Sequence, residues 1–183
     1  MTEKRKLLKH RQKKPHIGRG ILIGLIAGLA ASWTMNRFQA IWSEWPAHND
    51  AKKKERQLEE SSSNNENQYD ATVKAAAAVS EGLFEHQLTP AEKKIARPVV
   101  HYAVSGLGGI VYCLASEFFP EVTRGFGLPY GTAFWLVVDE GMVPLLGLAK
   151  GPTQYSLSTH AYALASHLVF GATAESTRRL LRD

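Results

Sequence analysis

The sequence has a single cysteine, Cys113, and it lacks the short motifs that usually mark an enzyme. One cysteine excludes an intrachain disulfide. There is no P-loop, GxGxxG, GxSxG, CxxC or HExxH, so the common signatures of nucleotide, acyl-transfer, redox and zinc-protease chemistry are missing. The motifs therefore predict no cofactor and favour a protein that is not an enzyme.

The chain as a whole also lacks hydrophobic character, because its mean hydropathy lies slightly below zero. This average hides an uneven distribution, since polar residues gather at the N-terminus and between Trp45 and Arg97. The remainder holds four apolar stretches near the ~20 residues that cross a bilayer. They are Gly20–Phe38, Pro98–Phe119, Phe126–Leu148 and Ser156–Leu180. The sequence thus predicts an all-α, polytopic membrane helix bundle with four transmembrane helices and a long polar loop between the first and second.

The predicted organisation has four parts. They are a basic cytoplasmic tail (1–19), the first transmembrane helix (20–38), a polar extracytoplasmic loop with short helices (39–97) and a three-helix membrane unit (98–183). Within the loop, Lys52–Asp70 is polar enough to stay solvated, and an amphipathic helix is expected from Ala71. Thr89, Pro90 and Glu92 have the spacing of an N-cap, a first-turn proline and a capping box. Another short helix should therefore lead into the second span.

Basic residues set the expected orientation of the chain. The formal net charge is +5, and lysines and arginines flank the apolar stretches. This placement favours a membrane protein over a nucleic-acid-binding one. The N-terminal tail, the turn with Arg124 and the end with Arg178, Arg179 and Arg182 would share the cytoplasmic side. The lipid bilayer is the expected partner, and a homo-oligomer or a membrane partner stays open.

A cleaved signal peptide is the rival interpretation of the basic N-terminus and its apolar stretch. No small-x-small cleavage site follows, because Thr34, Met35 and Asn36 come next. We therefore expect the first span to be retained.

Small residues recur at the spacing of close helix contacts. Gly24 and Gly28 form a GxxxG pattern, and Ser105 and Gly109 repeat its spacing, as do Ala161 and Ala165. Small residues four apart let helix backbones approach closely in lipid. The pattern predicts helix contacts at these positions, with composition alone as the other explanation.

Two consecutive carboxylates, Asp139 and Glu140, lie inside the third apolar stretch. An acid near the bilayer centre costs roughly 2.5–3.5 kcal/mol on insertion scales, so such groups usually face a partner, a cavity or a pathway. Pro144 follows and cannot donate the hydrogen bond that the Glu140 carbonyl expects in an α-helix, which predicts a kink. Consecutive side chains diverge by about 100° on a helix. We therefore expect one of the two, Glu140, to face inward.

Three histidines lie at a depth that overlaps with these acids. His101 is near the outer start of the second span, and His160 is near the outer start of the fourth. His167 is about two turns deeper than His160 on the same helix face. The ionisable set Glu140, Asp139, His167, His160 and His101 is the candidate proton- or ion-linked site, with Pro144 as its kink.

Other interpretations of this set stay open. The histidines are compatible with wet interfacial positions, and the acids with structural pairs that lock the bundle. Histidine and carboxylate also suit a metal such as zinc, although no tight ligand spacing is present, so the metal stays unknown. Glu117 and Glu175 lie near the cytoplasmic boundary, and Glu175 can reach Arg178 or Arg179 one turn on. For these two acids we expect ordinary surface ion pairs.

Three segments of the chain resemble one known family. They are HYAVSGLGGIVYCLASEFFP, GLPYGTAFWLVVDEGMVPLLGL and the fourth span with His160, His167, Glu175, Arg178 and Arg179. Together with GLIAGLAASWTMNRFQAIW, they are similar to the YagU-like family of bacterial inner-membrane proteins, whose relatives often carry histidine at the position of Asp139. The resemblance implies a multi-pass protein of the inner (plasma) membrane, with both termini cytoplasmic, and a link with acid resistance. It transfers no catalytic residue.

The function expected from these features is proton- or ion-linked, or related to acid stress, through the intramembrane histidines and carboxylates. Histidine changes charge near neutral to mildly acidic pH, so acid would alter the packing around it. The alternative is a non-catalytic structural or partner-binding membrane subunit, which would use the GxxxG face of the first span and the polar loop. A membrane metalloenzyme is a third hypothesis.

Overall fold

The structure is a computed structural model that describes residues 16–44 and 71–182, and every regular element within them is helical. The elements are α2 (Ile17–Ser43), α4 (Ala71–Phe84), α5 (Pro90–Phe118), η2 (Pro120–Thr123), α6 (Leu128–Trp135), η3 (Leu136–Met142), α7 (Val143–Leu145), η4 (Pro152–Gln154) and α8 (Leu157–Arg182). The short η2 and η4 are 3₁₀ turns, whereas η3 is π-helical. The all-α prediction is confirmed for the described residues. The predicted solvated stretch Lys52–Asp70 and most of the basic tail lie outside them.

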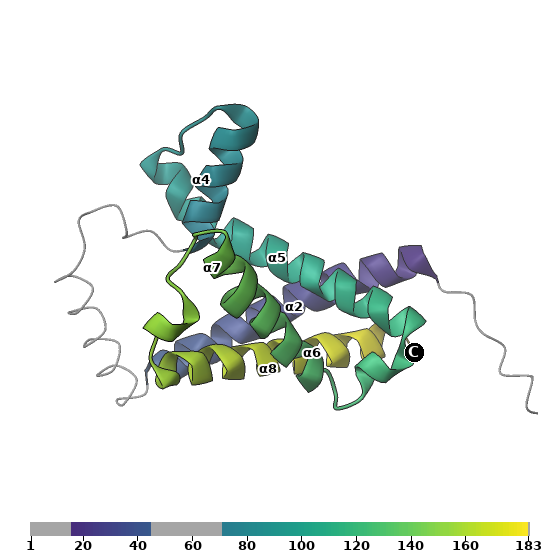
Figure 1. The fold of residues 1–183 in the computed structure, drawn as a ribbon. Coiled ribbons are helices and arrows are strands. Elements are labelled where there is room, and N and C mark those ends of the chain that lie inside the picture. Colours follow the sequence, from purple (N-terminus) through teal and green to yellow (C-terminus); the bar gives the residue numbers. More distant parts are fainter. Residues whose placement is uncertain (1–15, 45–70, 183) are drawn as a thin grey trace, which may run out of the picture.

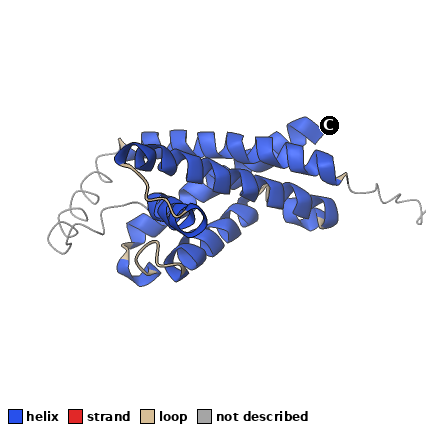
Figure 2. Cartoon of the chain, turned by 90° about the horizontal axis from the view of Figure 1, so that it is seen from above, coloured by secondary structure: helices blue, strands red, loops and turns tan. Residues whose placement is uncertain are grey.

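Three long helices form the body of the molecule. α2 packs along both α5 and α8, and α6 packs on α8 (Figures 1 and 2). α4 packs against the first part of α5 and projects from one end of the bundle (Figure 1). The first long helix is therefore part of the same bundle as the three later segments.

α2 runs antiparallel to both α5 and α8. Arg19, at the start of α2, donates to the carbonyl oxygens of Leu181 and Arg182 at 3.0 Å each. Arg182 in turn lies 3.2 Å from Glu117, near the end of α5. The start of α2, the end of α5 and the end of α8 thus meet at one end of the bundle, which we call the basic end. The opposite end, where α4 projects, is the α4 end.

Close contact between α2 and α5 depends on small residues. A Cβ atom on Gly28 would collide with the carbonyl oxygen of Ser105, and one on Gly109 would collide with the backbone of Gly24. The helices therefore touch backbone to backbone at the two small-residue patterns expected from the sequence, and that prediction is confirmed. Such an approach allows dense packing where bulky side chains would hold the helices apart.

A second close contact joins α6 to α8, at positions that the sequence analysis did not predict. Of the predicted pair, Ala161 is exposed and Ala165 is half-buried. The contact is made instead by Gly171, because a Cβ atom there would collide with the Gly127 carbonyl oxygen. Gly131 lies equally close to the backbone of His167. Glycines on both helices thus set this contact, which brings α6 and η3 onto α8.

Two of the four expected spans satisfy the length and hydropathy needed to cross a membrane. They are the helices Ile17–Ser43 and Pro90–Phe118. Residues 128–145 are helical throughout but are divided into α6, η3 and α7. α8 is long enough, with 26 residues, but its polar and charged side chains lower its hydropathy. The finding supports two apolar helices, and the four-pass arrangement stays a proposal.

α5 begins earlier than the second span was expected to begin. Its first residue is Pro90, and Pro98, expected at a boundary, lies inside it. The short helix predicted to lead into the second span is therefore continuous with that span. Thr89 is the N-cap: its hydroxyl accepts from the Glu92 amide at 3.3 Å, and its own amide donates to the Glu92 carboxylate at 2.7 Å. The predicted capping box is confirmed.

This capping box should resist strong acid. The pKa of Glu92 is lowered from 4.5 to about 2, mainly by the Thr89 backbone amide, then by the Thr89 hydroxyl and by His86. Because the folded pKa lies below the unfolded value, the stabilisation is complete above pH 4.5 and is lost as the pH falls through about 2. We expect amides in the first turn of α5 to keep their hydrogen-exchange protection down to about pH 3 and to lose it near pH 2.

A substitution tests the same contact at neutral pH. Glu92→Ala should lower the protection of the first turn of α5 at pH 7, because both hydrogen bonds to Thr89 are lost. Glu81→Ala, an exposed change on α4, is the matched control and should leave it unchanged. Equal protection in Glu92→Ala and the wild type would contradict the expectation.

Candidate functional site

A cavity of about 1100 Å³ lies between α5 and the segment α6–η3–α7, with α8 and part of α2 behind it. Its walls are largely apolar and include Val104 and Leu107 of α5 and Val137 of η3. These wall side chains are themselves exposed, at 36%, 63% and 57%. The cavity is therefore open along the side of the bundle, where α5 and η3 separate.

Asp139 and Glu140 both line this cavity from η3. The helix adopts π geometry over Leu136–Met142, just before Pro144, and the helical stretch ends at Leu145. π turns widen a helix and are frequent at functional sites. The expectation that only Glu140 would face inward is wrong, because each acid lies beside a different histidine of α8. α8 runs antiparallel to η3, so the deeper acid meets the deeper histidine.

Glu140 contacts His160 at the α4 end of the cavity. Nδ1 of His160 lies 2.7 Å from Oε1 of Glu140, and Nε2 lies 2.9 Å from the carbonyl oxygen of Pro152. Both neighbours are acceptors when Glu140 is ionised, yet a neutral imidazole carries one N–H only. The two contacts are satisfied by an imidazolium beside a carboxylate, or by neutral His160 accepting from protonated Glu140. Either way, one proton lies between Nδ1 and Oε1, and the pair has no net charge.

Asp139 and His167 form a looser pair deeper in the cavity. Nδ1 of His167 lies 3.7 Å from Oδ2 of Asp139 and 2.9 Å from the carbonyl oxygen of Ala163. The ring N–H of His167 therefore donates to the carbonyl oxygen of Ala163. The Asp139 carboxylate remains able to accept hydrogen bonds from the cavity. The His167 side chain is 7% exposed, and that of Asp139 is 39% exposed. Asp139 is thus the more open of the two.

His101 lines the same cavity from α5. Its ring lies 5.9 Å from that of Tyr102, in an edge-on arrangement. All five ionisable residues predicted from the sequence therefore border one cavity, although only four of them lie in the two acid–histidine pairs described above. Among the described residues, no group of three or more His, Cys, Asp or Glu side chains is arranged to hold a metal ion.

Four aromatic side chains close the inner side of the cavity. We call Tyr112, Tyr130, Phe134 and Phe170 the aromatic layer. Phe134 stacks on Phe170 at 5.2 Å and on Tyr130 at 5.9 Å, and Tyr130 lies 4.6 Å from Tyr112. Tyr112 and Phe170 are completely buried. His167 touches the outer side of this layer, 5.8 Å from Phe134.

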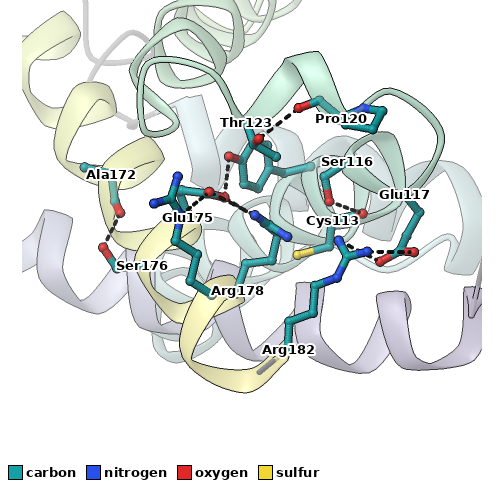
Figure 3. Close-up of polar contacts among 12 residues, drawn as sticks. Cys113, Ser116, Glu117, Pro120, Thr123, Ala172, Glu175, Ser176, Arg178 and Arg182 are labelled. Carbon is teal, nitrogen blue, oxygen red and sulfur yellow. Dashed lines mark hydrogen bonds and ion pairs between the residues drawn. The ribbon is translucent and has the colours of Figure 1, made fainter. Parts of the chain in front are cut away.

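A second polar cluster surrounds Glu175 (Figure 3), which is linked to the aromatic layer through Tyr112. Glu175 of α8 accepts from Tyr112 at 2.8 Å, from Arg178 at 2.6 and 2.9 Å, and from Arg179 at 2.6 Å. Glu175 is fully buried, and Arg178 is 8% exposed. The pairing with the arginines is as expected, but the expected surface position is wrong. Glu117 does pair near the surface, with the exposed Arg182.

The sequence contained a signal for the buried position of Glu175. His167, Gly171, Glu175 and Arg178 are separated by four, four and three residues, which places them on one helix face. All four are buried in α8. A glutamate continuing the stripe that begins with His167 should therefore have been assigned to the interior.

One protein family matches the part of the chain that contains the site. The family described as "Protein of unknown function (DUF1440)" matches residues 76–176, which is more than half of the chain, and the chain belongs to this family. The matched region contains both acid–histidine pairs, the aromatic layer and Glu175. No curated protein and no solved structure matches the chain. The resemblance to the YagU-like proteins and the link with acid resistance stay expectations.

Proposed function

We propose that this chain is a four-pass protein of the bacterial inner membrane that responds to protons reaching it from outside the cell. The observation that carries the proposal is the contact between His160 and Glu140, which requires a shared proton, at the border of an open cavity. Intramembrane acids and histidines are expensive in lipid and are commonly functional.

The proposed response follows from the proton count of the pair. While the shared proton is present, His160 and Glu140 attract each other and join η3 to α8. Loss of one proton from this pair leaves a single imidazole N–H for two acceptors, the Glu140 carboxylate and the Pro152 carbonyl oxygen, so one of the two contacts of His160 is lost. The contact between η3 and α8 would then loosen as the outside pH rises and tighten as it falls. Acid would thus favour the arrangement in which η3 and α8 are in contact.

The surroundings of the pair contain both charged and aromatic groups. His160 also lies 6.3 Å from the rings of Trp135 and Tyr155. The other ionisable side chains that border the cavity are Arg97, His101, Tyr102, Tyr130, Asp139, Lys150 and His167. Histidine is the member of this set that titrates near physiological pH in its unperturbed state. His160, as the histidine held by a carboxylate at hydrogen-bonding distance, is the proposed sensor.

The bundle geometry supports the four-pass topology. The basic residues that favour the cytoplasm gather at the basic end, where α2 starts and α5 and α8 end. The α4 end, with His160 and Glu140, would then face the outside. The aromatic layer lies between the cavity and Glu175, and we propose that it keeps water and protons in the cavity from reaching the basic end. This favours sensing of protons over their conduction.

Trp135 offers a native probe of the proposed proton. In full-length protein in lipid nanodiscs, with Trp33, Trp42 and Trp45 replaced by Phe, the Trp135 fluorescence should fall on acidification from about pH 9 to about pH 5. A charged imidazolium quenches a neighbouring indole more than a neutral ring does. Glu140→Gln should remove this transition or move it by at least about one pH unit, because an amide cannot hold the shared proton.

The control for this titration is Glu121→Gln. Glu121 is an exposed acid of η2, at the basic end, and the same acid-to-amide change there should leave the transition unchanged. A Glu140→Gln protein that titrates like the wild type would overturn the proposal. Survival of bacteria expressing either variant in strong acid would then test the link with acid stress separately.

A structural or partner-binding subunit is less favoured. That alternative relied on the GxxxG face of the first span together with the polar loop. Gly24 and Gly28 are covered by Ser105 and Gly109 of the same chain, and residues 45–70 of the loop lie outside the described residues. The face is therefore used within the molecule.

A further inference from the structure

We propose that the cavity binds a lipophilic organic cation, with Asp139 as its counter-ion. The inference deepens the proposed function, since it rests on the same cavity being embedded in the membrane, but it concerns a ligand other than the proton. A site for protons alone needs two side chains and little space. The cavity measures about 1100 Å³, slightly above the roughly 300–1000 Å³ typical of sites for small organic ligands.

The walls determine the apolar part of the ligand. Val104 and Leu107 on one side and Val137 on the other present exposed aliphatic surface at the opening between α5 and η3. In the proposed four-pass arrangement this opening would lie on the lipid side of the bundle. A ligand dissolved in the bilayer can enter through this side. Burial of its apolar groups against these walls would contribute about 25 cal/mol for each Å² removed from water.

Asp139 and the aromatic side chains at the inner side of the cavity, which we call its floor, determine the charge of the ligand. Asp139 projects from η3 with 39% of its side chain exposed, and the N–H on Nδ1 of His167 belongs to Ala163. The carboxylate therefore offers negative charge to the cavity. Phe134, Tyr130 and Phe170 border the same cavity, and the faces of aromatic rings attract cations. A carboxylate and aromatic rings in one cavity with aliphatic walls suit a quaternary or protonated amine or a phosphonium with apolar substituents.

The basic residues of the cavity lie away from this floor. Arg97 precedes the apolar part of α5, and Lys150 follows α7, so both lie toward the α4 end. Asp139 lies six residues before Leu145, where α7 ends, so Lys150 lies beyond the end of the helical segment that carries Asp139. A cation that enters through the side between α5 and η3 can reach Asp139 without passing between them.

The probe for a direct test is tetraphenylphosphonium, which has a permanent charge and no titratable proton. Full-length protein in nanodiscs should bind radiolabelled probe saturably at pH 8, and Asp139→Asn should weaken binding at least tenfold. Glu121→Gln, the matched change at the basic end, should bind as the wild type does. Triphenylphosphine oxide, a neutral analogue, should compete at least tenfold more weakly than unlabelled probe.

A second variant tests the same cavity in case Asp139→Asn fails to fold. Val137→Trp keeps the carboxylate but fills the wall, and it should also weaken binding at least tenfold while its circular dichroism stays helical. Absence of saturable binding, equal binding by Asp139→Asn, or equal competition by the neutral analogue would each overturn the inference. The Trp135 titration separates the two proposals: an intact transition without cation binding sinks only this one.

Discussion

Glu175→Gln is expected to destabilise the protein by about 3–5 kcal/mol, because it leaves a buried arginine without its counter-charge. Glu175 is fully buried and accepts from Tyr112, Arg178 and Arg179. Arg178 is itself 8% exposed and cannot turn to water without moving α8. Reversible unfolding of the full chain in mixed micelles, followed by circular dichroism, measures the loss.

Glu117→Gln is the matched control for this change. Glu117 pairs with Arg182, which is 40% exposed, at the same end of the bundle. Exposed ion pairs contribute about 0–1 kcal/mol, so this variant should unfold close to the wild type. Similar losses for the two variants would mean that Glu175 is not held in a dry interior.

Gly28→Ala is expected to be the second most damaging of these changes, with a loss of about 1–3 kcal/mol or more. Alanine normally stabilises a helix relative to glycine by about 1 kcal/mol, so the expected sign is opposite to the intrinsic propensity. The reason is that a methyl group at this position meets the Ser105 carbonyl oxygen and the Gly106 backbone, which cannot move aside as a flexible side chain can. Separation of α2 from α5 would follow.

Gly18→Ala provides the control in the same helix. No atom lies within 4 Å of the position that its Cβ would occupy. This variant should therefore be as stable as the wild type or slightly more stable, whereas Gly28→Ala should unfold earlier in the same assay. A stabilised Gly28→Ala would show that the backbones of α2 and α5 are not in contact.

Much of the fold could be predicted from the sequence. Apolar stretches located the long helices, and Thr89, Pro90 and Glu92 located the start of α5, because capping depends on local spacing. The α2–α5 contact was also predictable, since Gly24, Gly28 and their partners repeat at intervals of four. The contact of α6 with α8 was missed although Gly127 and Gly131 also lie four residues apart, because their partner Gly171 comes from a distant segment and has no second glycine at that spacing.

The candidate site was predictable in its membership but not in its pairing. The sequence placed the acids and histidines at one depth, because alternating passes fix depth. It did not reveal that Asp139 and Glu140 would both face α8, since regular α geometry was assumed where the helix is π-helical before Pro144. Glu175 was assigned to the surface from its nearness to the chain end, although helix periodicity pointed inward.

The aromatic layer would make the proposed sensor respond to one side of the membrane only. Tyr112, Tyr130, Phe134 and Phe170 lie between the two polar clusters, so in the proposed topology they would separate Glu140 from the cytosol. The molecule would then report the acidity of one compartment and ignore buffering in the other. Any signal from the cavity to the basic end would therefore be a movement of the protein itself. α8 is suited to transmit it, because His160, His167, Glu175 and Arg178 all lie on this one helix.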